Sequence, residues 1–283
     1  MTEIYSKGLL KGKTAFIAGG SSGLNLGIAE KYAELGANLV ILSRSQDKID
    51  VAVKGLQDKG AKAIGIATDV RDYDGVLAAF EKTHEEFGDI HCVISGAAGN
   101  FLSPIVGLSS KGFQTVVDID LVGTFNVFRA SWDFLAKPGA SLIAITAGQA
   151  VQPRPYQAHA CAAKAGVNML CKCLALEWGQ AGVRVNAISP GPIEDTEGFS
   201  RLVPTEEIAQ KTKKKIPLRA MGTKNDVADV ATFLASDASI YTTGSIYNVD
   251  GGKELGDASL DFMTPFKRYA RRNAPTTIRR KPS

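Results

Sequence analysis

The sequence predicts an α/β fold: a single doubly wound domain around a mostly parallel, seven-stranded sheet. The chain has 283 residues, 45% of them hydrophobic, which suits one large domain with a sizeable core. Short, continuously apolar segments alternate with helical patterns along the chain. Such segments are typical of strands buried on both faces of a sheet, with helices as the covering layers. The predicted strands span 14–20, 38–44, 62–70, 91–99, 141–147, 184–191 and 245–252.

Two helical patterns support this arrangement. After the first strand, Ile28, Tyr32 and Leu35 share one face of a predicted helix, and Gly36 ends it. A longer helix follows "PYQAH". Its apolar stripe runs with helical spacing through Val167, Leu170, Cys171, Leu174 and Trp178. Sheets of this kind bind ligands beyond the carboxyl ends of their strands, so each predicted strand end is a candidate site.

Composition and charge exclude several classes of protein. No apolar stretch reaches the roughly 18 residues of a membrane-spanning helix, and no apolar segment of a secretory signal follows the N-terminus. The four cysteines have neither metal nor disulfide spacing, so we predict no metal site and free thiols in a reducing compartment. The chain ends in "KPS" and not in the peroxisomal address Ser-Lys-Leu, so a cytoplasmic location is expected.

The net charge of +4 is unevenly distributed. Residues 267–283 carry seven basic residues and no acid, so the remainder of the chain is slightly acidic. A basic segment can bind nucleic acid or a phosphorylated ligand. We interpret this one as a solvated terminus, or as an arm on a neighbouring subunit, and expect no nucleic-acid partner.

The turn after the first predicted strand, "GGSSGL", suits a phosphate group. Its glycines allow a tight turn and a close backbone approach, and the N-terminus of the following helix favours an anion. A plain strand-to-helix turn that uses similar glycines is the alternative. We predict that the turn binds a nucleotide cofactor through Gly19, Ser21, Ser22, Gly23 and Leu24.

The second predicted strand ends in "SRS", with Arg44 and no acid beside it. A cofactor with a free ribose 2′-hydroxyl usually meets an acid at this place. A guanidinium suits a 2′-phosphate instead, because it can donate two parallel charge-assisted hydrogen bonds. The sequence therefore favours NADP(H). The third strand ends in "TDV", where the Asp69 carboxylate is expected to accept a hydrogen bond from the adenine amino group of the cofactor. The next residue, Val70, is expected to contact the cofactor as well.

Six motifs occur in order along the chain: "GGSSG", "TDV", "LVGTFNV", "AAKAG", "SPGPI" and "VDGG". With them, the chain resembles the short-chain dehydrogenase/reductase superfamily over roughly residues 8–255. Within it, "AAGNF", "VDIDLVGTFNV", "HACAAKAG" and "PGPIEDTEGFSRL" are most similar to 2,4-dienoyl-CoA reductases of the peroxisomal type. The resemblance implies a Rossmann-type NADP-binding reductase domain, which we place over 1–258. The basic tail that the charge distribution indicates is placed over 259–283. The resemblance further implies NADPH-dependent reduction of unsaturated acyl-CoA thioesters, with cofactor contacts from Pro190, Gly191, Ile193 and Thr196.

A tyrosine that most of this superfamily needs is missing. It stands four residues before the lysine and protonates an alkoxide, but here Ala160 precedes Lys164 at that spacing. The resemblance implies that the peroxisomal type protonates a dienolate carbon, using an aspartate and a lysine that hold a water molecule. These match Asp120 and Lys164, and the lysine also contacts the cofactor. Asn100 matches the asparagine that donates to the thioester oxygen, and Phe101 beside it is expected to contact substrate.

The sequence departs from the superfamily at several positions, which leaves alternatives open. Asn25 replaces the third glycine of the phosphate turn, and "SG" at 95–96 replaces a pair of asparagines. The mitochondrial type of reductase carries its tyrosine where this chain has Gln149. Tyr156 precedes Lys164 by eight residues, close to the spacing of enoyl-carrier-protein reductases, so a 2-enoyl-thioester reductase is one alternative. A 3-ketoacyl or hydroxyl-acting dehydrogenase and a non-catalytic nucleotide-binding scaffold are the others.

The segment of about residues 194–217 lies where a lid would close over substrate. It contains "KTKKK", a compact positive cluster, and we predict that Lys211 and Lys214 bind the phosphates of the acyl-CoA substrate. A solvated helix face is the alternative for these lysines. The resemblance also implies a homotetramer built on the helices around 110–136 and 157–180.

Overall fold

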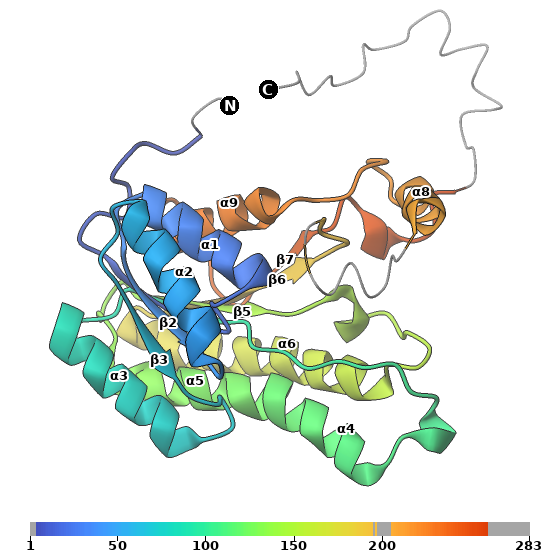
Figure 1. Ribbon diagram of the computed structural model, residues 1–283, viewed down its shortest axis with the longest axis horizontal. Coiled ribbons are helices and arrows are strands. Elements are labelled where there is room, and N and C mark those ends of the chain that lie inside the picture. Colours follow the sequence, from blue (N-terminus) through green and yellow to red (C-terminus); the bar gives the residue numbers. More distant parts are fainter. Residues whose placement is uncertain (1–3, 195, 197–204, 260–283) are drawn as a thin grey trace, which may run out of the picture.

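Seven parallel strands form one sheet through the middle of the structure (Figure 1). The computed structural model describes residues 4–194, 196 and 205–259. The strand order is β3-β2-β1-β4-β5-β6-β7, and every neighbouring pair is parallel. All seven predicted strands are confirmed: β1 (Thr14–Ala18), β2 (Asn38–Ser43), β3 (Ala63–Ala67), β4 (Cys92–Ser95), β5 (Ser141–Ile145), β6 (Arg184–Pro190) and β7 (Ile246–Val249).

The strand order reverses at β1. The strands β2 and β3 lie on one side of it, and β4 to β7 lie on the other. Loops that leave β1 and β4 therefore diverge at the carboxyl ends of these strands, which opens the crevice where such sheets bind ligands. The glycine turn after β1 and the "AAGNF" loop after β4 consequently lie side by side: a Cβ on Gly19 would be 2.8 Å from the Ala97 nitrogen.

Helices cover both faces of the sheet, as the buried strands require (Figure 1). One face is packed against α1 (Gly23–Glu34), α2 (Gln46–Asp58) and α9 (Lys224–Ala235). The other is packed against α3 (Tyr73–Phe87), α5 (Gly123–Ser131) and α6 (Ala158–Trp178). The shorter helices α4 (Ser110–Val117) and α8 (Glu206–Lys215) precede α5 and α9 in the chain.

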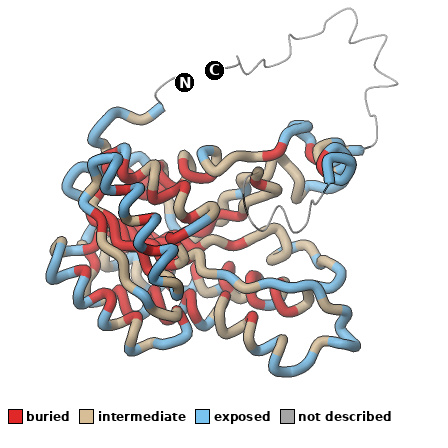
Figure 2. Tube along the Cα trace, viewed as in Figure 1, coloured by how far each residue is buried: buried red, intermediate tan, exposed pale blue. Residues whose placement is uncertain are grey.

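The core consists of two apolar clusters, one on each face of the sheet. Phe16 points to the first, where its ring stacks on Phe80 with centroids 4.0 Å apart. The next residue, Ile17, points to the second, together with Ile28 of α1. Each such fully buried side chain stabilises the fold by about 1.5–3 kcal/mol. Figure 2 shows that the buried residues concentrate in the strands and in the helix surfaces that face them.

The two predicted helices are confirmed, with one shifted boundary. The helix α1 begins at Gly23, immediately after the glycine turn, and so includes residues assigned to the turn from sequence. Its predicted inner face, Ile28, Tyr32 and Leu35, is buried. Along α6 the predicted apolar stripe faces the core, with Val167, Cys171 and Leu174 buried and Leu170 and Trp178 packed against the same cluster.

A short π-helical turn, Asp118–Val122, joins α4 to α5. π-turns inside helices are rare and cluster at functional sites, because the extra residue redirects a side chain. Here the turn directs Asp120 into the protein, where it is 1% exposed. The periodicity of the sequence does not reveal this insertion.

The predicted division of the chain stays a prediction. The described residues up to 259 belong to one α/β unit, and the basic tail over 260–283 lies outside the described residues. The same holds for residues 195 and 197–204 of the predicted lid, whereas α8 forms its described part.

Candidate active site

A cleft of about 1030 Å³ lies at the carboxyl ends of the strands. Loops after β1, β2, β3, β4, β5 and β6 line it, as expected for the crevice of a doubly wound sheet. The cleft brings together nearly all the cofactor residues predicted from sequence: Gly19, Ser21, Ser22, Gly23, Leu24, Arg44, Asp69, Val70, Pro190, Gly191, Ile193 and Thr196. It also contains Asn100 and Phe101, which were assigned to the substrate.

The glycine turn has the features that a phosphate group requires. Gly19 has a φ of +77° and packs against the backbone of Ala97, so no larger residue fits there. Gly23 has a φ of +59°, and no atom lies within 4 Å of where its Cβ would be. Ser22, the N-cap residue of α1, makes no side-chain capping bond to the helix. The N-terminus of α1 therefore faces the cleft as an uncapped positive dipole end with open space above it, which fits a pyrophosphate.

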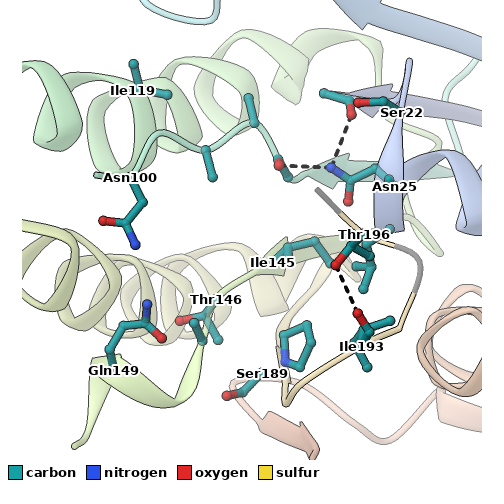
Figure 3. Close-up of a pocket in the computed structure, with 18 of the residues that line it drawn as sticks. Ser22, Asn25, Asn100, Ile119, Ile145, Thr146, Gln149, Ser189, Ile193 and Thr196 are labelled. Atoms are coloured by element: carbon teal, nitrogen blue, oxygen red, sulfur yellow. Dashed lines mark hydrogen bonds between the residues drawn. The ribbon is translucent and has the colours of Figure 1, made fainter. Parts of the chain in front are cut away.

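Asn25 does not block the glycine turn but stabilises it through hydrogen bonds. Its Nδ2 donates to the carbonyl of Gly19 at 3.2 Å and to that of Gly96 at 2.9 Å, so it links the ends of β1 and β4 (Figure 3). A Cβ on Gly96 would lie 2.3 Å from this nitrogen. The two departures from the superfamily pattern, at 25 and at 96, are therefore complementary: the amide at 25 occupies the space that glycine at 96 leaves.

Arg44 and Asp69 stand at the ends of β2 and β3, as predicted. Arg71 binds the Asp69 carboxylate with two bonds, Nε to Oδ1 at 3.0 Å and Nη2 to Oδ2 at 2.6 Å. Hydrogen bonding from Arg71 holds the pKa of Asp69 below its usual value, with a smaller contribution from the Arg44 charge. Because Arg71 occupies this carboxylate, the Arg44 guanidinium can turn its donors to the cleft, and the adjacent Lys48 lines the cleft as well.

The Asp120–Lys164 pair lies directly beneath the cleft. Lys164 Nζ is 3.2 Å from Asp120 Oδ2, and the side chains are 9% and 2% exposed. Lys164 Nζ also donates to the carbonyl of Ile145 at 2.9 Å, and Asp120 Oδ1 accepts from the Gly99 amide at 2.7 Å. Ile145 itself lines the cleft, whereas the charged pair is not among the lining residues. An ammonium has three donors, so one N–H of Lys164 is left for a bound group or a water molecule.

The burial of this pair shows that Asp120 is not an acid of the protein surface. A buried carboxylate needs partners, and Asp120 finds them in a cation and a backbone amide. It thereby connects Lys164 to Gly99, the residue next to Asn100. The sequence identified both charged residues, but the depth at which they lie follows from the π-turn and from α6.

Three carboxamides gather on the substrate side of the cleft. Asn100 Nδ2 donates to Gln157 Oε1 at 2.8 Å, and Gln149 Nε2 donates to the same oxygen at 3.2 Å. All three residues line the cleft, and Figure 3 shows the side chains of Asn100 and Gln149 directed toward one another from two different loops. Gln157 is not among the site residues predicted from the sequence. The sequence feature that could indicate Gln157 is a polar residue at the start of a predicted helix, which the structure places opposite Asn100.

Aromatic residues near this cluster differ in their roles. The ring of Phe101 packs on the fully buried His159, with ring centroids 4.5 Å apart, so His159 supports the wall of the cleft from below. Tyr156 has a φ of +65°, is 58% exposed and is not among the residues that line the cleft. It is therefore poorly placed to act as the acid of a 2-enoyl reductase.

The predicted lysine cluster is not brought to the cleft. Only Thr212 of α8 lines it. Lys211 pairs with Glu207 on its own helix at 2.6 Å, and Lys214 is exposed. Lys213 and Lys215 pair with Glu194 and Asp257, which attach α8 to the chain segments after β6 and β7. These contacts favour the alternative of a solvated helix face, and phosphate binding by Lys211 and Lys214 stays a prediction without geometric support.

The described residues contain no group of three or more His, Cys, Asp or Glu side chains arranged to hold a metal ion. Within the same residues, no helix has the length and apolar character needed to cross a membrane.

Comparison with known proteins agrees with the fold. The family model described as enoyl-(acyl carrier protein) reductase matches residues 18–254. The chain is 42% identical over 260 residues to a peroxisomal 2,4-dienoyl-CoA reductase of Danio rerio, covering 91% of this chain and 87% of that protein. It is 40% identical over 248 residues to the corresponding protein of Saccharomyces cerevisiae, covering 86% and 85%. The crystal structure of a short chain dehydrogenase from Bacillus anthracis superposes with a TM-score of 0.78 at 35% identity, covering 87% and 98%.

These relatives overturn one expectation. Both of these reductases are named peroxisomal, so the cytoplasmic location expected from the last three residues is wrong. A targeting address is read by a receptor and is independent of the fold, so a single tripeptide was weak ground for that inference. The fold, the order of the motifs and these similarities together establish that the chain is an oxidoreductase and belongs to the short-chain dehydrogenase/reductase family.

Proposed function

We propose that the protein reduces a carbon–carbon double bond of 2,4-dienoyl-CoA with NADPH. The observation that carries this proposal is the buried Asp120–Lys164 pair in a site where Ala160 replaces the tyrosine. A reductase that makes an alcohol needs a hydroxyl acid near the new alkoxide. A reductase that protonates carbon needs only a positioned proton source, and this pair supplies the groups to hold one. The similarity to 2,4-dienoyl-CoA reductases supports the same assignment.

NADPH supplies a hydride to the reaction. The residues that would hold it are those of the glycine turn, Arg44 at the 2′-phosphate, and the segment from Pro190 to Ile193. The uncapped N-terminus of α1 fits the pyrophosphate, and the absence of an acid beside Arg44 in the sequence fits a phosphorylated ribose. The remaining donor of Lys164 fits a ribose hydroxyl.

The relatives are named as producing (3E)-enoyl-CoA, which defines where the atoms go. A double bond between C3 and C4 of the product requires hydride addition at C5 and proton addition at C2. Between these steps the electron pair is delocalised from C2 onto the thioester oxygen. The protein therefore has two tasks, to stabilise charge on that oxygen and to deliver one proton to C2.

Asn100 is the group of this chain that suits the first task. Its carboxamide lines the cleft and is exposed to it, so it can donate to an oxygen that develops negative charge. Asp120 and Lys164 suit the second task. Asp120 uses Oδ1 for the Gly99 amide and shares Oδ2 with Lys164, so it keeps lone pairs for a water molecule, which the nearby Lys164 charge can polarise. Such a water can transfer its proton to C2 and be reprotonated from solvent.

The alternatives have less support. A 2-enoyl reductase that used Tyr156 would need a side chain that this structure leaves exposed outside the cleft. A hydroxyl-acting dehydrogenase would need a hydroxyl in place of Ala160. A non-catalytic scaffold would have no need of a buried ion pair, whose desolvation is costly.

The test is NADPH oxidation against a panel of 2,4-dienoyl, 2-enoyl and 3-ketoacyl thioesters of CoA. We expect turnover of the dienoyl substrate and a 3-enoyl product by mass spectrometry and NMR. Turnover of the 3-ketoacyl thioester alone would refute the proposal. Faster oxidation with the 2-enoyl thioester than with the dienoyl one would assign the protein to the alternative class.

We also propose a homotetramer and a peroxisomal location. Phe113, Phe125, Met169 and Leu176 on α4, α5 and α6 are exposed, which supports burial of this helical surface between copies of the chain. Light scattering on the purified protein tests the first proposal, with a monomer mass as the contrary result. The peroxisomal names of the relatives support the second. Imaging of the full chain with a fluorescent tag at its N-terminus tests it, and a diffuse signal would contradict it.

A further inference from the structure

Gln157 occupies an unusual position between the two sides of the substrate cleft. It is the N-cap residue of α6, but its side chain makes no capping bond to the helix. Its Oε1 instead accepts from Asn100, on the loop after β4, and from Gln149, on the loop after β5. A helix N-cap residue commonly uses its side chain to satisfy the first turn. This one is used to join two loops of the active site.

The contact decides which way the Asn100 carboxamide faces. A carboxamide has a donor end and an acceptor end of nearly the same shape, so rotation by half a turn exchanges them. Asn100 is exposed, and packing does not distinguish the two orientations. With Gln157 Oε1 at 2.8 Å, only the nitrogen of Asn100 can face it, because two acceptor oxygens would repel one another. One N–H is used in this bond, and the other remains for a ligand.

Gln149 in turn fixes the orientation of Gln157. Its Nε2 donates to Oε1 at 3.2 Å, so that oxygen receives two donors and both its lone pairs are used. Rotation of the Gln157 carboxamide by half a turn would place its nitrogen, a donor, opposite the donor nitrogens of Asn100 and Gln149. The polarity of the three amides is therefore determined as a unit, from Gln149 through Gln157 to Asn100.

We infer that Gln157 is a positioning residue that directs the donor end of Asn100 to the thioester oxygen, and that Gln149 sets the polarity of Gln157. The inference rests on the proposed function, because it gives Asn100 a carbonyl oxygen to recognise. The cleft is then specific for thioester carbonyls whose oxygen gains negative charge, and two further side chains, Gln157 and Gln149, set this preference through Asn100.

The first test is a double-mutant cycle on Gln157 and Asn100. Asn100→Ala is expected to lower kcat for 2,4-hexadienoyl-CoA by about 10²-fold or more, the usual effect of losing an oxyanion donor. Gln157→Leu is expected to lower kcat about tenfold, which corresponds to one net hydrogen bond. In the Asn100→Ala background, Gln157→Leu should change kcat less than about twofold, since nothing is left to direct. Gln180→Leu, at an exposed glutamine near the far end of α6, is the matched control and should leave kcat unchanged.

The second test reverses the polarity of the amides. Gln149→Glu replaces a donor by an acceptor of the same shape, so the Gln157 nitrogen turns toward it. Asn100 must then turn its oxygen to the Gln157 nitrogen, and this oxygen replaces the NH₂ group whose second N–H served the ligand. We expect a loss in kcat of about tenfold or more from a side chain that makes no bond to Asn100. If Gln149 sets polarity, Gln149→Leu should lower kcat less than Gln149→Glu. A purely structural role would not depend on polarity, and the two variants would then lose similar activity. The dissociation constant for NADPH should stay within about twofold in all variants.

The inference would be overturned if Gln157→Leu or Gln149→Glu lowered kcat by the same factor in the Asn100→Ala background as in the unmodified protein. Each residue would then act independently of Asn100. Unchanged kcat in Gln157→Leu would overturn it as well. Calorimetric binding of saturated hexanoyl-CoA with NADP⁺ present repeats the cycle without catalysis. A protein that failed to reduce dienoyl-CoA but showed the same non-additivity in binding would refute the proposed function and not the positioning role.

Discussion

Replacing Asp120 by asparagine tests the chemistry of the site most directly. Asparagine keeps the size of the side chain, and its Oδ1 can still accept from the Gly99 amide, which lies at 2.7 Å in the unmodified protein. The second oxygen, 3.2 Å from Lys164 Nζ, becomes an NH₂ group. Two donors then face each other, and the Lys164 cation loses its counter-ion at a site where it is 9% exposed.

The geometry gives the size of the effect. Two unit charges 3.2 Å apart interact with about 5 kcal/mol at an effective dielectric constant of about 20. Removal of one partner of a buried pair typically costs about 3–5 kcal/mol of stability, because the other charge stays buried and uncompensated. Loss of a positioned proton source lowers kcat by about 10²–10⁴-fold. We therefore expect Asp120→Asn to unfold at a lower temperature and to turn over at least 10²-fold more slowly, while the glycine turn and Arg44 still bind NADPH.

Single-turnover NADPH oxidation with a 2,4-dienoyl-CoA is the assay, at a temperature where circular dichroism shows the variant to be folded. Asp118→Asn, in the same π-turn, is the matched control and should retain the unmodified rate. Lys164→Ala should be slower than Asp120→Asn, because it also removes the donor next to the cofactor. Ala160→Tyr should not raise the rate, since a carbon is protonated and not an alkoxide. An unmodified rate in folded Asp120→Asn would refute the reasoning and assign the proton to another group.

Three further predictions follow from other parts of the structure. Arg44→Ala should abolish most of a preference for NADPH over NADH, at a cost of about 1.5–3 kcal/mol; equal dissociation constants for both cofactors in the unmodified protein would exclude the assigned role. Gly96→Ala should destabilise the fold by about 1–3 kcal/mol, because its Cβ would lie 2.3 Å from the Asn25 amide, and adding Asn25→Gly should restore part of the loss in urea unfolding. Burial raises the pKa of Cys92 and of Cys171 to about 12. The unfolded chain releases these protons near pH 9 and the folded protein does not, so unfolding becomes easier between pH 9 and about 12. Each thiol contributes about 1.4 kcal/mol per pH unit, and Cys171→Ala should flatten the fall in unfolding free energy measured from pH 8 to pH 10.

Much of the cofactor half of the site could be predicted from the sequence, because it depends on local patterns. A glycine turn between an apolar strand and a helix is encoded in a few consecutive residues, and the parallel sheet brings all strand ends to one edge. Gly19, Gly23 and Arg44 accordingly lie where they were expected. The phosphate-binding role predicted for the lysine cluster has no support from the structure, because it depends on contacts and not on a local pattern. The pattern "KTKKK" gives the charge, but it does not say that Lys211 already has Glu207 as a partner one helical turn away.

The sequence by itself determined the seven-stranded α/β fold and the phosphate turn, because apolar runs and glycine spacing are local properties. The resemblance to peroxisomal-type 2,4-dienoyl-CoA reductases identified Asp120 and Lys164 as the charged pair. Tertiary structure alone decided how these residues act. Asp120 is buried because a π-turn, invisible in the hydrophobic pattern, rotates it inward. Asn25 is tolerated only because Gly96, seventy-one residues later, leaves room for its amide. Gln157 directs Asn100 only because crossover connections bring the ends of β4, β5 and α6 to one cleft, and contacts between distant segments have no signature in either segment alone.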